Sequence, residues 1–210
     1  MLKIGLALLP IFLALLVSEV LWRKKILRGE AARKTLHIII GSYVASWPFY
    51  IPLVDIQLIS IALLVVVAFS HRLKIFHAII DIKRASWGDM LYAVGIGLTA
   101  TLTNEPWIFA IAILHMSLCD GLAGLLGNHY GKNNQFKILG QPKSIVGTVV
   151  FAVSSFIVLL LLVPGNLQPS LGLYLFVIPV IGALIESVGV YGTDNVMVPL
   201  VLVYLLNIVA

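Results

Sequence analysis

The stretch IVGTVVFAVSSFIVLLLLV, residues 145–163, decides the class of fold, because none of its side chains carries a charge. A helix needs about 20 predominantly apolar residues to cross the hydrocarbon core of a bilayer. The whole chain of 210 residues has the same character, with 60% hydrophobic and 11% charged residues, whereas soluble domains average roughly 25% charged residues. This composition excludes a water-soluble domain, and it excludes a disordered chain, which needs low hydrophobicity and high charge.

Seven further apolar stretches predict an all-α polytopic integral membrane protein with about eight transmembrane helices. Three of the stretches are short for a full span, so eight is the best count. No repeat or linker divides the chain, and residues 1–210 are expected to form a single transmembrane helical domain. The eight stretches lie at approximately 4–22, 36–53, 56–70, 89–103, 107–126, 145–163, 171–190 and 196–209.

The lysines and arginines predict the orientation. With eight spans, thirteen of the fourteen basic residues fall on one side of the membrane, and Lys3 falls on the other. The positive-inside rule makes the basic side cytoplasmic, which places the N- and C-termini outside. The segment 70–89 mixes apolar and basic residues at helical spacing, so it is expected either as a helix on the cytoplasmic membrane surface or as a plain basic loop.

Solvation does not explain three of the carboxylates. Asp120, Glu186 and Asp194 lie at or near the cytoplasmic ends of apolar segments, where an uncompensated carboxylate is energetically expensive. Asp55 and Glu105, by contrast, lie in short external turns and are expected to be solvated. The first three residues are therefore candidates for chemistry.

Residues 114–148 form the most unusual segment, LHMSLCDGLAGLLGNHYGKNNQFKILGQPKSIVGT. Asp120, Gly124, Gly127 and Gly131 recur on one face of a helix. A glycine face admits either a neighbouring helix backbone or a flat ligand. Asp120 at the head of this face favours the ligand, because a packing motif needs no carboxylate.

Lys143 and Ser144 precede an apolar run, and Pro142 suits the first turn of a helix. We therefore expect both residues near a helix N-terminus, where free N–H groups and the helix dipole favour anions. The spacing is not that of a Walker A loop, so the signal is weak alone. Combined with the glycine face and with Asp120, which could hold Mg²⁺, it predicts a nucleotide site.

Two further clusters are expected on the cytoplasmic side. Arg33 and His37 lie on one face of a helix. Glu186 lies on one side of a glycine-containing break, and the adjacent residues Asp194 and Asn195 lie on the other. This arrangement is typical of a metal or hydroxyl site, or alternatively of helix capping. The other histidines lack metal-ligand spacing and are expected in packing or at interfaces.

The order of the motifs RKTLH, RASWGD, DGLAGLLGNHYG, PKSIVGT and ESVGVYGTDN resembles the CTP-dependent lipid-alcohol kinase family. That family includes dolichol, phytol and farnesol kinases and the CTP-using diacylglycerol kinase. The resemblance covers about residues 33–199, most of the chain. It implies transfer of the γ-phosphoryl group of CTP to a membrane-dissolved alcohol, with Mg²⁺ or another divalent cation, at the cytoplasmic face.

The resemblance also suggests roles for individual residues. Asp120 is expected to hold the cation, and Lys143 to bind phosphate. Asp194 is the candidate base for the lipid hydroxyl, with Glu186 as the alternative. Many family members have Glu where this chain has Val146, so any role of that glutamate is absent here or is supplied by Glu186 or Asp194. Nucleotide binding is expected from Arg33, Lys34, Gly124, Gly127, Gly131, Lys143, Ser144, Gly147 and Thr148, and substrate contacts from His37 and Asn195.

Two rival functions stay open. A cytidylyltransferase would release pyrophosphate from CTP and form a CDP-lipid. A small transporter would line a path with polar residues at mid-membrane, whereas the carboxylates here gather at one face. The expected partners are a membrane lipid alcohol and a nucleoside triphosphate, with no nucleic acid, and the oligomeric state is open.

Overall fold

The computed structural model describes residues 2–73, 77, 86–162 and 171–209, and helices dominate this part of the chain. Each of the eight apolar stretches overlaps a helix. The elements in chain order are α1 (Leu2–Arg23), α2 (Gly29–Val44), the 3₁₀ turn η1 (Trp47–Phe49), α3 (Leu53–Leu73), α5 (Gly88–Leu102), α6 (Pro106–Leu114), the π-helical turn η2 (His115–Cys119), α7 (Asp120–Tyr130), the 3₁₀ turn η3 (Lys132–Asn134), β1 (Gln135–Ile138), β2 (Gln141–Ser144), α8 (Ile145–Leu162), α9 (Leu171–Val188) and α10 (Asp194–Val209).

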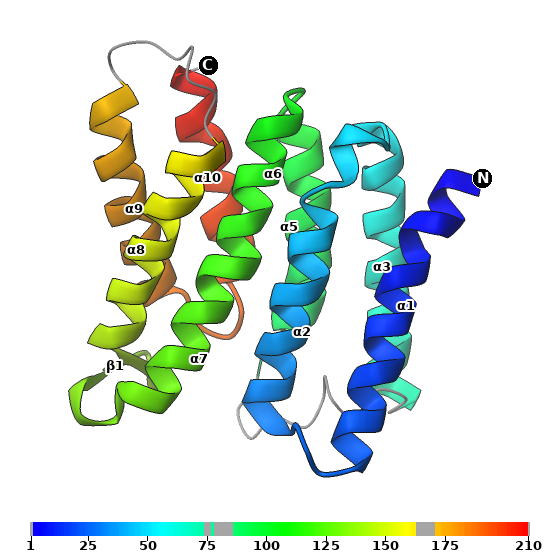
Figure 1. The fold of residues 1–210 in the computed structure, drawn as a ribbon, viewed down its shortest axis with the longest axis horizontal. Coiled ribbons are helices and arrows are strands. Elements are labelled where there is room, and N and C mark those ends of the chain that lie inside the picture. Colours follow the sequence, from blue (N-terminus) through cyan, green and yellow to red (C-terminus); the bar gives the residue numbers. More distant parts are fainter. Residues whose placement is uncertain (1, 74–76, 78–85, 163–170, 210) are drawn as a thin grey trace.

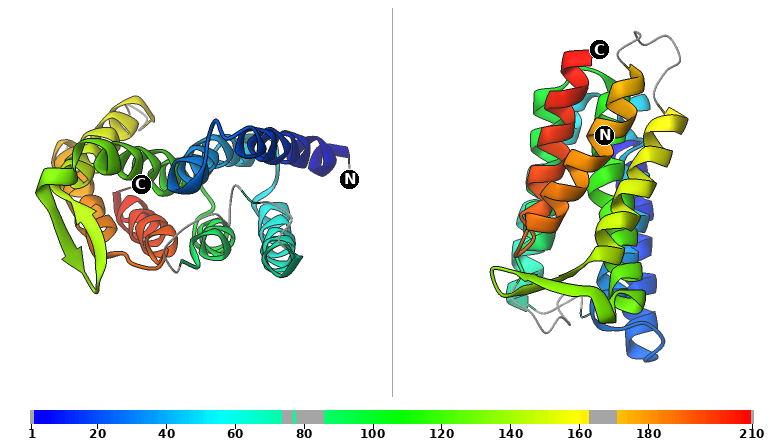
Figure 2. Two further views of the ribbon diagram at one scale, coloured as in Figure 1. Left: turned by 90° about the horizontal axis from the view of Figure 1, so that it is seen from below. Right: turned by 90° about the vertical axis from the view of Figure 1, so that its left-hand side faces the viewer.

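The helices form two layers (Figures 1 and 2). One layer contains α1, α2, the continuous α6–η2–α7 helix and α8, and the other contains α3, α5, α10 and α9. The described part of α1 begins, and that of α10 ends, at the end of the bundle opposite the β1–β2 hairpin. The loop between α1 and α2 lies at the hairpin end (Figure 1), and it contains Lys24, Lys25 and Arg28.

Four helical segments are long and apolar enough to cross a membrane, and three further apolar helices are shorter. The longest of the four combines α6, η2 and α7, and it is also the most deeply enclosed by other helices. The number of spans, eight, therefore stays a prediction. The four long segments are Ile4–Arg23, Leu53–Leu73, Pro106–Tyr130 and Ile145–Leu162.

The helix at the second apolar stretch, expected at about 36–53, lies earlier in the chain. This helix, α2, begins before position 36 and ends at Val44, and the 3₁₀ turn η1 follows. Pro48 and Pro52 explain the earlier end of α2, because proline has no amide proton and clashes with the preceding turn of a helix. The earlier start brings Arg33 and Lys34 into α2.

The expectation that Pro142 opens a helix is wrong, and the hairpin is an exception to the all-α prediction. Pro142 lies in β2 opposite Lys137 of β1, and α8 begins only at Ile145. Leu139 and Gly140 form the two-residue loop with φ angles of 46° and 79°, a pair of positive values that fits a type I′ hairpin turn. Proline is tolerated because each strand of a two-stranded ribbon has a free edge.

The proposed surface helix at 70–89 falls largely on 74–76 and 78–85, which lie outside the described residues, so it stays a prediction. His77 is described, and it is attached to α1. Its amide and Nδ1 are 2.9 and 3.0 Å from the carboxylate oxygens of Glu19, and its ring stacks on Trp22.

A tight turn joins α9 to α10 and packs on the start of α5. Gly192 has a φ of 93°, and a Cβ at this position would overlap the Cα of Gly88. The amide of Trp87 donates to the carbonyl of Tyr191 at 2.9 Å, and Nδ2 of Asn195 donates to the carbonyl of Gly88 at 2.6 Å. The turn therefore fixes where α10 begins.

We predict that Gly192→Ala lowers the stability of the purified protein by at least about 1–3 kcal/mol, because it adds backbone strain and a steric overlap. Thermal unfolding in detergent measures the effect. Gly172→Ala is the matched control, since no heavy atom lies within 4 Å of the added Cβ, and it should leave the melting temperature unchanged or slightly raised. Equal melting temperatures for the two variants would contradict the conclusion that Gly192 lies in a strained and closely packed turn.

Candidate active site

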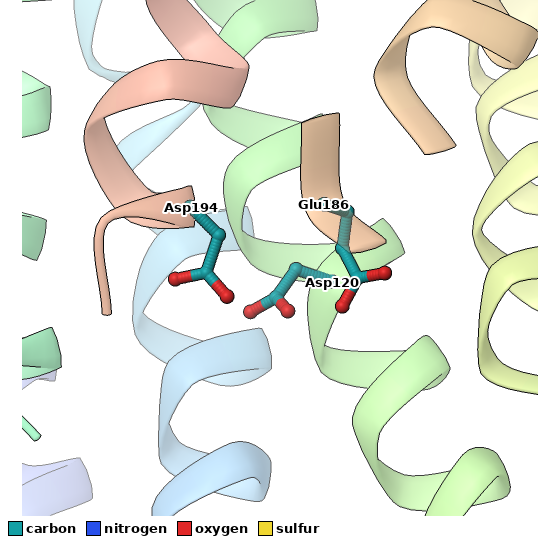
Figure 3. A group of neighbouring side chains, drawn as sticks. All are labelled: Asp120, Glu186 and Asp194. Carbon is teal, nitrogen blue, oxygen red and sulfur yellow. The ribbon is translucent and has the colours of Figure 1, made fainter. Parts of the chain in front are cut away.

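Three carboxylates from three helices meet at the hairpin end of the bundle (Figure 3). Asp120 is the first residue of α7, Glu186 lies in the last turn of α9, and Asp194 is the first residue of α10. One oxygen of each lies within 4.8 Å of the others. Asp120 and Glu186 are only 2% and 6% exposed, and Asp194 is half-buried. The structure therefore brings together the three carboxylates that the sequence singles out.

A π-helical turn directly precedes Asp120. Such turns insert an extra residue into an α-helix and occur often at functional sites. They rotate the face that the following residues present. In η2 the carbonyl of Met116 lies 2.8 Å from Nε2 of His37, which joins this turn to α2. The same histidine nitrogen is 3.3 Å from Oδ2 of Asp120.

Two lysines neutralise much of the negative charge. Nζ of Lys34 is 2.5 Å from Oδ2 of Asp120. Nζ of Lys143 donates to both the carboxylate and the backbone carbonyl of Glu186, each at 2.6 Å, and lies 3.7 Å from Oδ2 of Asp194. Burial lowers the pKa of Lys143, but the carboxylates of Glu186 and Asp194 outweigh burial and raise that pKa. Lys143 is therefore a cation at neutral pH.

A cavity of about 700 Å³ opens beside these five charged groups. Its wall contains residues of α2, α7, the hairpin, α8, α9 and the start of α10. Many of the residues expected from the sequence to form the site lie in this wall. They are Lys34, Asp120, Gly124, Gly127, Lys143, Ser144, Gly147, Glu186 and Asp194.

The glycines of α7 pack against their neighbours and also border the cavity. A Cβ at Gly127 would lie 3.1 Å from the Cα of Gly147, so α7 and α8 approach closely here. A Cβ at Gly124 would lie 2.7 Å from Cε of Lys34, so this glycine leaves room for the lysine side chain. Both glycines also line the cavity. This glycine face of α7 therefore lets α8 approach closely, and it forms part of the cavity wall.

Ser144 confirms the expected helix N-terminus, although the helix starts after it. Its Oγ accepts a hydrogen bond of 3.1 Å from the amide of Gly147, three residues later. This is the geometry of an N-cap. The first turn of α8 therefore presents its amide end near the cavity, where it favours an anion.

Five expected site residues lie outside the wall of this cavity. Gly131 packs against Ser144, the hydroxyl of Thr148 bonds that of Ser187 at 2.8 Å, and Asn195 bonds the backbone of α5. Arg33 and His37 line a second, smaller cavity on a neighbouring face of α2. The sequence grouped these five with the nucleotide site or its substrate contacts, but none of them lines the large cavity.

Further residues in the wall were missed from the sequence. Glu30 lines the cavity and bonds Arg33 at 2.6 Å; its place three residues before an arginine was the available signal. Gln135 reaches the wall because β1 pairs with β2 opposite Ser144, which requires the hairpin to be known. Val146 is not part of the wall, and carboxylates from α9 and α10 reach the cavity instead.

Apolar helices with buried, paired charges at one end define this chain as a membrane protein with an enzyme-like polar site. A curated relative, the phytol kinase of Synechocystis sp. (strain ATCC 27184 / PCC 6803 / Kazusa), is 30% identical over 207 residues, which cover 94% of this chain and 87% of the relative. No family model matches the chain, and no solved structure matches it. The chain belongs to the CTP-dependent lipid-alcohol kinase family.

The pairing of Lys34 with Asp120 is open to a double-mutant cycle. We predict that Asp120→Asn and Lys34→Met each destabilise the protein by about 3–5 kcal/mol, because each leaves a buried charge without its partner. The double variant should lose much less than the sum of the two. Unfolding in detergent gives the three values.

Lys137→Met serves as the control for the cycle, since Lys137 is an exposed residue of the same basic end of the protein. Its effect should stay within about 0.5 kcal/mol. Strictly additive losses at Lys34 and Asp120 would show that the two side chains do not form the buried pair.

Proposed function

We propose that this chain is an integral membrane kinase that transfers the γ-phosphoryl group of CTP to the hydroxyl of an isoprenoid lipid alcohol. The family supports a lipid-alcohol kinase, and the phytol kinase supports an isoprenoid substrate. The observation that carries the proposal is the 700 Å³ cavity, with three carboxylates and two lysines around it. Phosphoryl transfer depends mostly on positioning and on charge neutralisation, and this arrangement provides both.

The donor set of the cavity fits a divalent cation such as Mg²⁺, which prefers carboxylate oxygens and binds through one or two of them together with substrate phosphates. Asp120 and Glu186 would hold the cation, because both are buried and one oxygen of each lies within 4.8 Å of the other. When bound, the cation neutralises charge on the triphosphate and polarises the phosphoryl group that is transferred.

The lysines would bind the phosphates of CTP. Lys34 and Lys143 now pair with carboxylates, and their ammonium groups can turn to phosphate oxygens when the nucleotide enters. Gly124 and Gly127 leave a wall without side chains along which the nucleotide lies. The amide end of α8, capped by Ser144, adds a favourable environment for an anion.

Asp194 would accept the proton of the lipid hydroxyl. It is half-buried and lies 3.7 Å from Lys143, farther than Glu186, so it is the least committed of the three carboxylates. The hydroxyl oxygen attacks the γ-phosphorus, its proton passes to Asp194, and the bond from the γ-phosphorus to the bridging oxygen breaks. The products are CDP and the phosphorylated alcohol.

We also propose that the hairpin end faces the cytoplasm and that eight helices span the membrane. The excess of lysine and arginine in the loops at this end supports the orientation. In this orientation the cavity draws its nucleotide from the cytoplasm, while the alcohol stays in the bilayer.

Asp120→Asn should reduce phosphorylation of isoprenoid alcohols by at least about 100-fold, since it removes a charge that acts on the transferred group. The assay uses purified protein in nanodiscs with CTP, Mg²⁺ and a panel of alcohols including phytol. Asp55→Asn is the matched control, because Asp55 lies in the first turn of α3 at the opposite end of the bundle, and it should keep full activity. Full activity of Asp120→Asn would remove this residue from the mechanism.

Cation binding can be tested apart from turnover. We expect Mn²⁺ titrated into the protein without nucleotide to bind, as measured by electron paramagnetic resonance, and Glu186→Gln to weaken that binding at least about tenfold. Glu105→Gln, from the external turn before α6, should bind like the original protein. Equal binding by both variants would contradict the assignment of Glu186.

A further inference from the structure

A second cavity of about 130 Å³ lies between the two layers, where α1 and α2 face α3 and α5. Each of these four helices contributes apolar side chains to its wall. Ile11 comes from α1, Ile40 from α2, Val67 from α3, and Ala93 and Ile96 from α5. This cavity is distinct from the polar one, and the proposed phosphoryl-transfer residues do not account for it.

The polar groups of this cavity gather at one end. Arg33 and Asp89 lie near the starts of α2 and α5, and Ser70 lies near the end of α3, all at the hairpin end of the bundle. Ile40 and Ile96 lie seven positions farther along α2 and α5, which is about 10 Å at 1.5 Å per residue. The wall therefore changes from polar to apolar along its length, as the two ends of a lipid alcohol do.

His37 connects the two cavities. Its ring lines the apolar cavity and lies 4.3 Å from the ring of Tyr92, while its Nε2 is 3.3 Å from Oδ2 of Asp120 in the polar cavity. A hydroxyl at the polar end of the apolar cavity is therefore separated from the carboxylates by about the width of one side chain. Arg33 lies at the same end and interacts electrostatically with Asp120 and Asp194.

The apolar cavity also opens sideways. Val66 lines it and is 54% exposed, and its neighbours on the outer surface of α3, Val65 and Phe69, are exposed apolar residues as well. Such a surface faces hydrocarbon when α3 spans a membrane. A chain can therefore enter from the bilayer, and the part that exceeds the cavity can stay in the lipid.

We propose that this cavity binds the hydrocarbon chain of the isoprenoid alcohol, with the hydroxyl at the end formed by Arg33 and His37. The inference rests on the proposed function, because it gives that reaction its acceptor site. The alcohol and the nucleotide then approach the carboxylates along neighbouring faces of α2, and the hydroxyl has to pass the His37 ring to give its proton to Asp194.

Photolabelling tests the location without any reaction. A farnesol analogue with a diazirine in its chain is irradiated with the protein in nanodiscs, without nucleotide, and the labelled residues are found by mass spectrometry. We expect labels on residues such as Ile40, Val67 and Ile96, and at least a tenfold reduction of labelling by excess farnesol. Labels confined to outer residues such as Leu160 and Leu161, unaffected by farnesol, would overturn the proposal.

Two substitutions, one on α3 and one on its neighbour α5, test the use of the cavity in the reaction. Ala93→Phe and Val67→Phe fill the cavity, and each should raise the KM for farnesol at least tenfold while the KM for CTP changes less than twofold. Leu98→Phe is the matched control, since Leu98 lies on α5, is 38% exposed and is not part of the wall. It should leave both KM values within twofold.

The outcomes separate the two proposals. Phosphorylation with an unchanged KM for farnesol in both filled variants, and labels elsewhere, would overturn the acceptor site and keep the kinase. Competed labelling inside the cavity without phosphorylation would keep the site and overturn the kinase. If Ala93→Phe does not fold, Val67→Phe and the labelling of the unaltered protein still show whether this cavity is the acceptor site.

Discussion

Buried carboxylates have to be compensated, and the arrangement of this protein depends on how that is done. Asp120, Glu186 and Asp194 share one end of an apolar bundle, where isolated charges would be very unfavourable. Lys34 of α2 and Lys143 of β2 provide the compensation through ion pairs of 2.5 and 2.6 Å. The hairpin and α2 are therefore held against α7 and α9 by charge as well as by packing. The same pairs keep two ammonium groups beside the cavity in which an anionic nucleotide is proposed to bind.

Much of the fold could be predicted from the sequence, because apolarity and length alone locate helices in a chain of this composition. The carboxylates could be recognised for a similar reason, since each lies at or near the end of an apolar segment. The hairpin could not be predicted, because its turn needs a positive φ at Leu139 and leucine rarely adopts one. Lys34 and Asp120 are 86 positions apart, so no local spacing relates them.

The residues of the RKTLH motif are divided between the two cavities. Successive residues of a helix point about 100° apart, so neighbours in sequence face different surroundings. Lys34 reaches the polar cavity, whereas Arg33 and His37 line the apolar one. A single helix thus separates a site suited to a charged, water-soluble molecule from a site suited to a chain dissolved in lipid. A kinase that acts on membrane alcohols needs both kinds of site within reach of the same carboxylates.

The polar cavity is proposed to transfer the terminal phosphoryl group of a nucleotide to a lipid alcohol. The most direct measurement incubates the purified protein with farnesol and Mg²⁺ and with CTP labelled at either the γ- or the α-phosphorus, then counts the label in the extracted lipid. We expect the γ-label to enter the lipid and the α-label to stay in CDP, with transfer dependent on Asp120. Label from the α-phosphorus in the lipid, or transfer that is unaffected by Asp120→Asn, would contradict it.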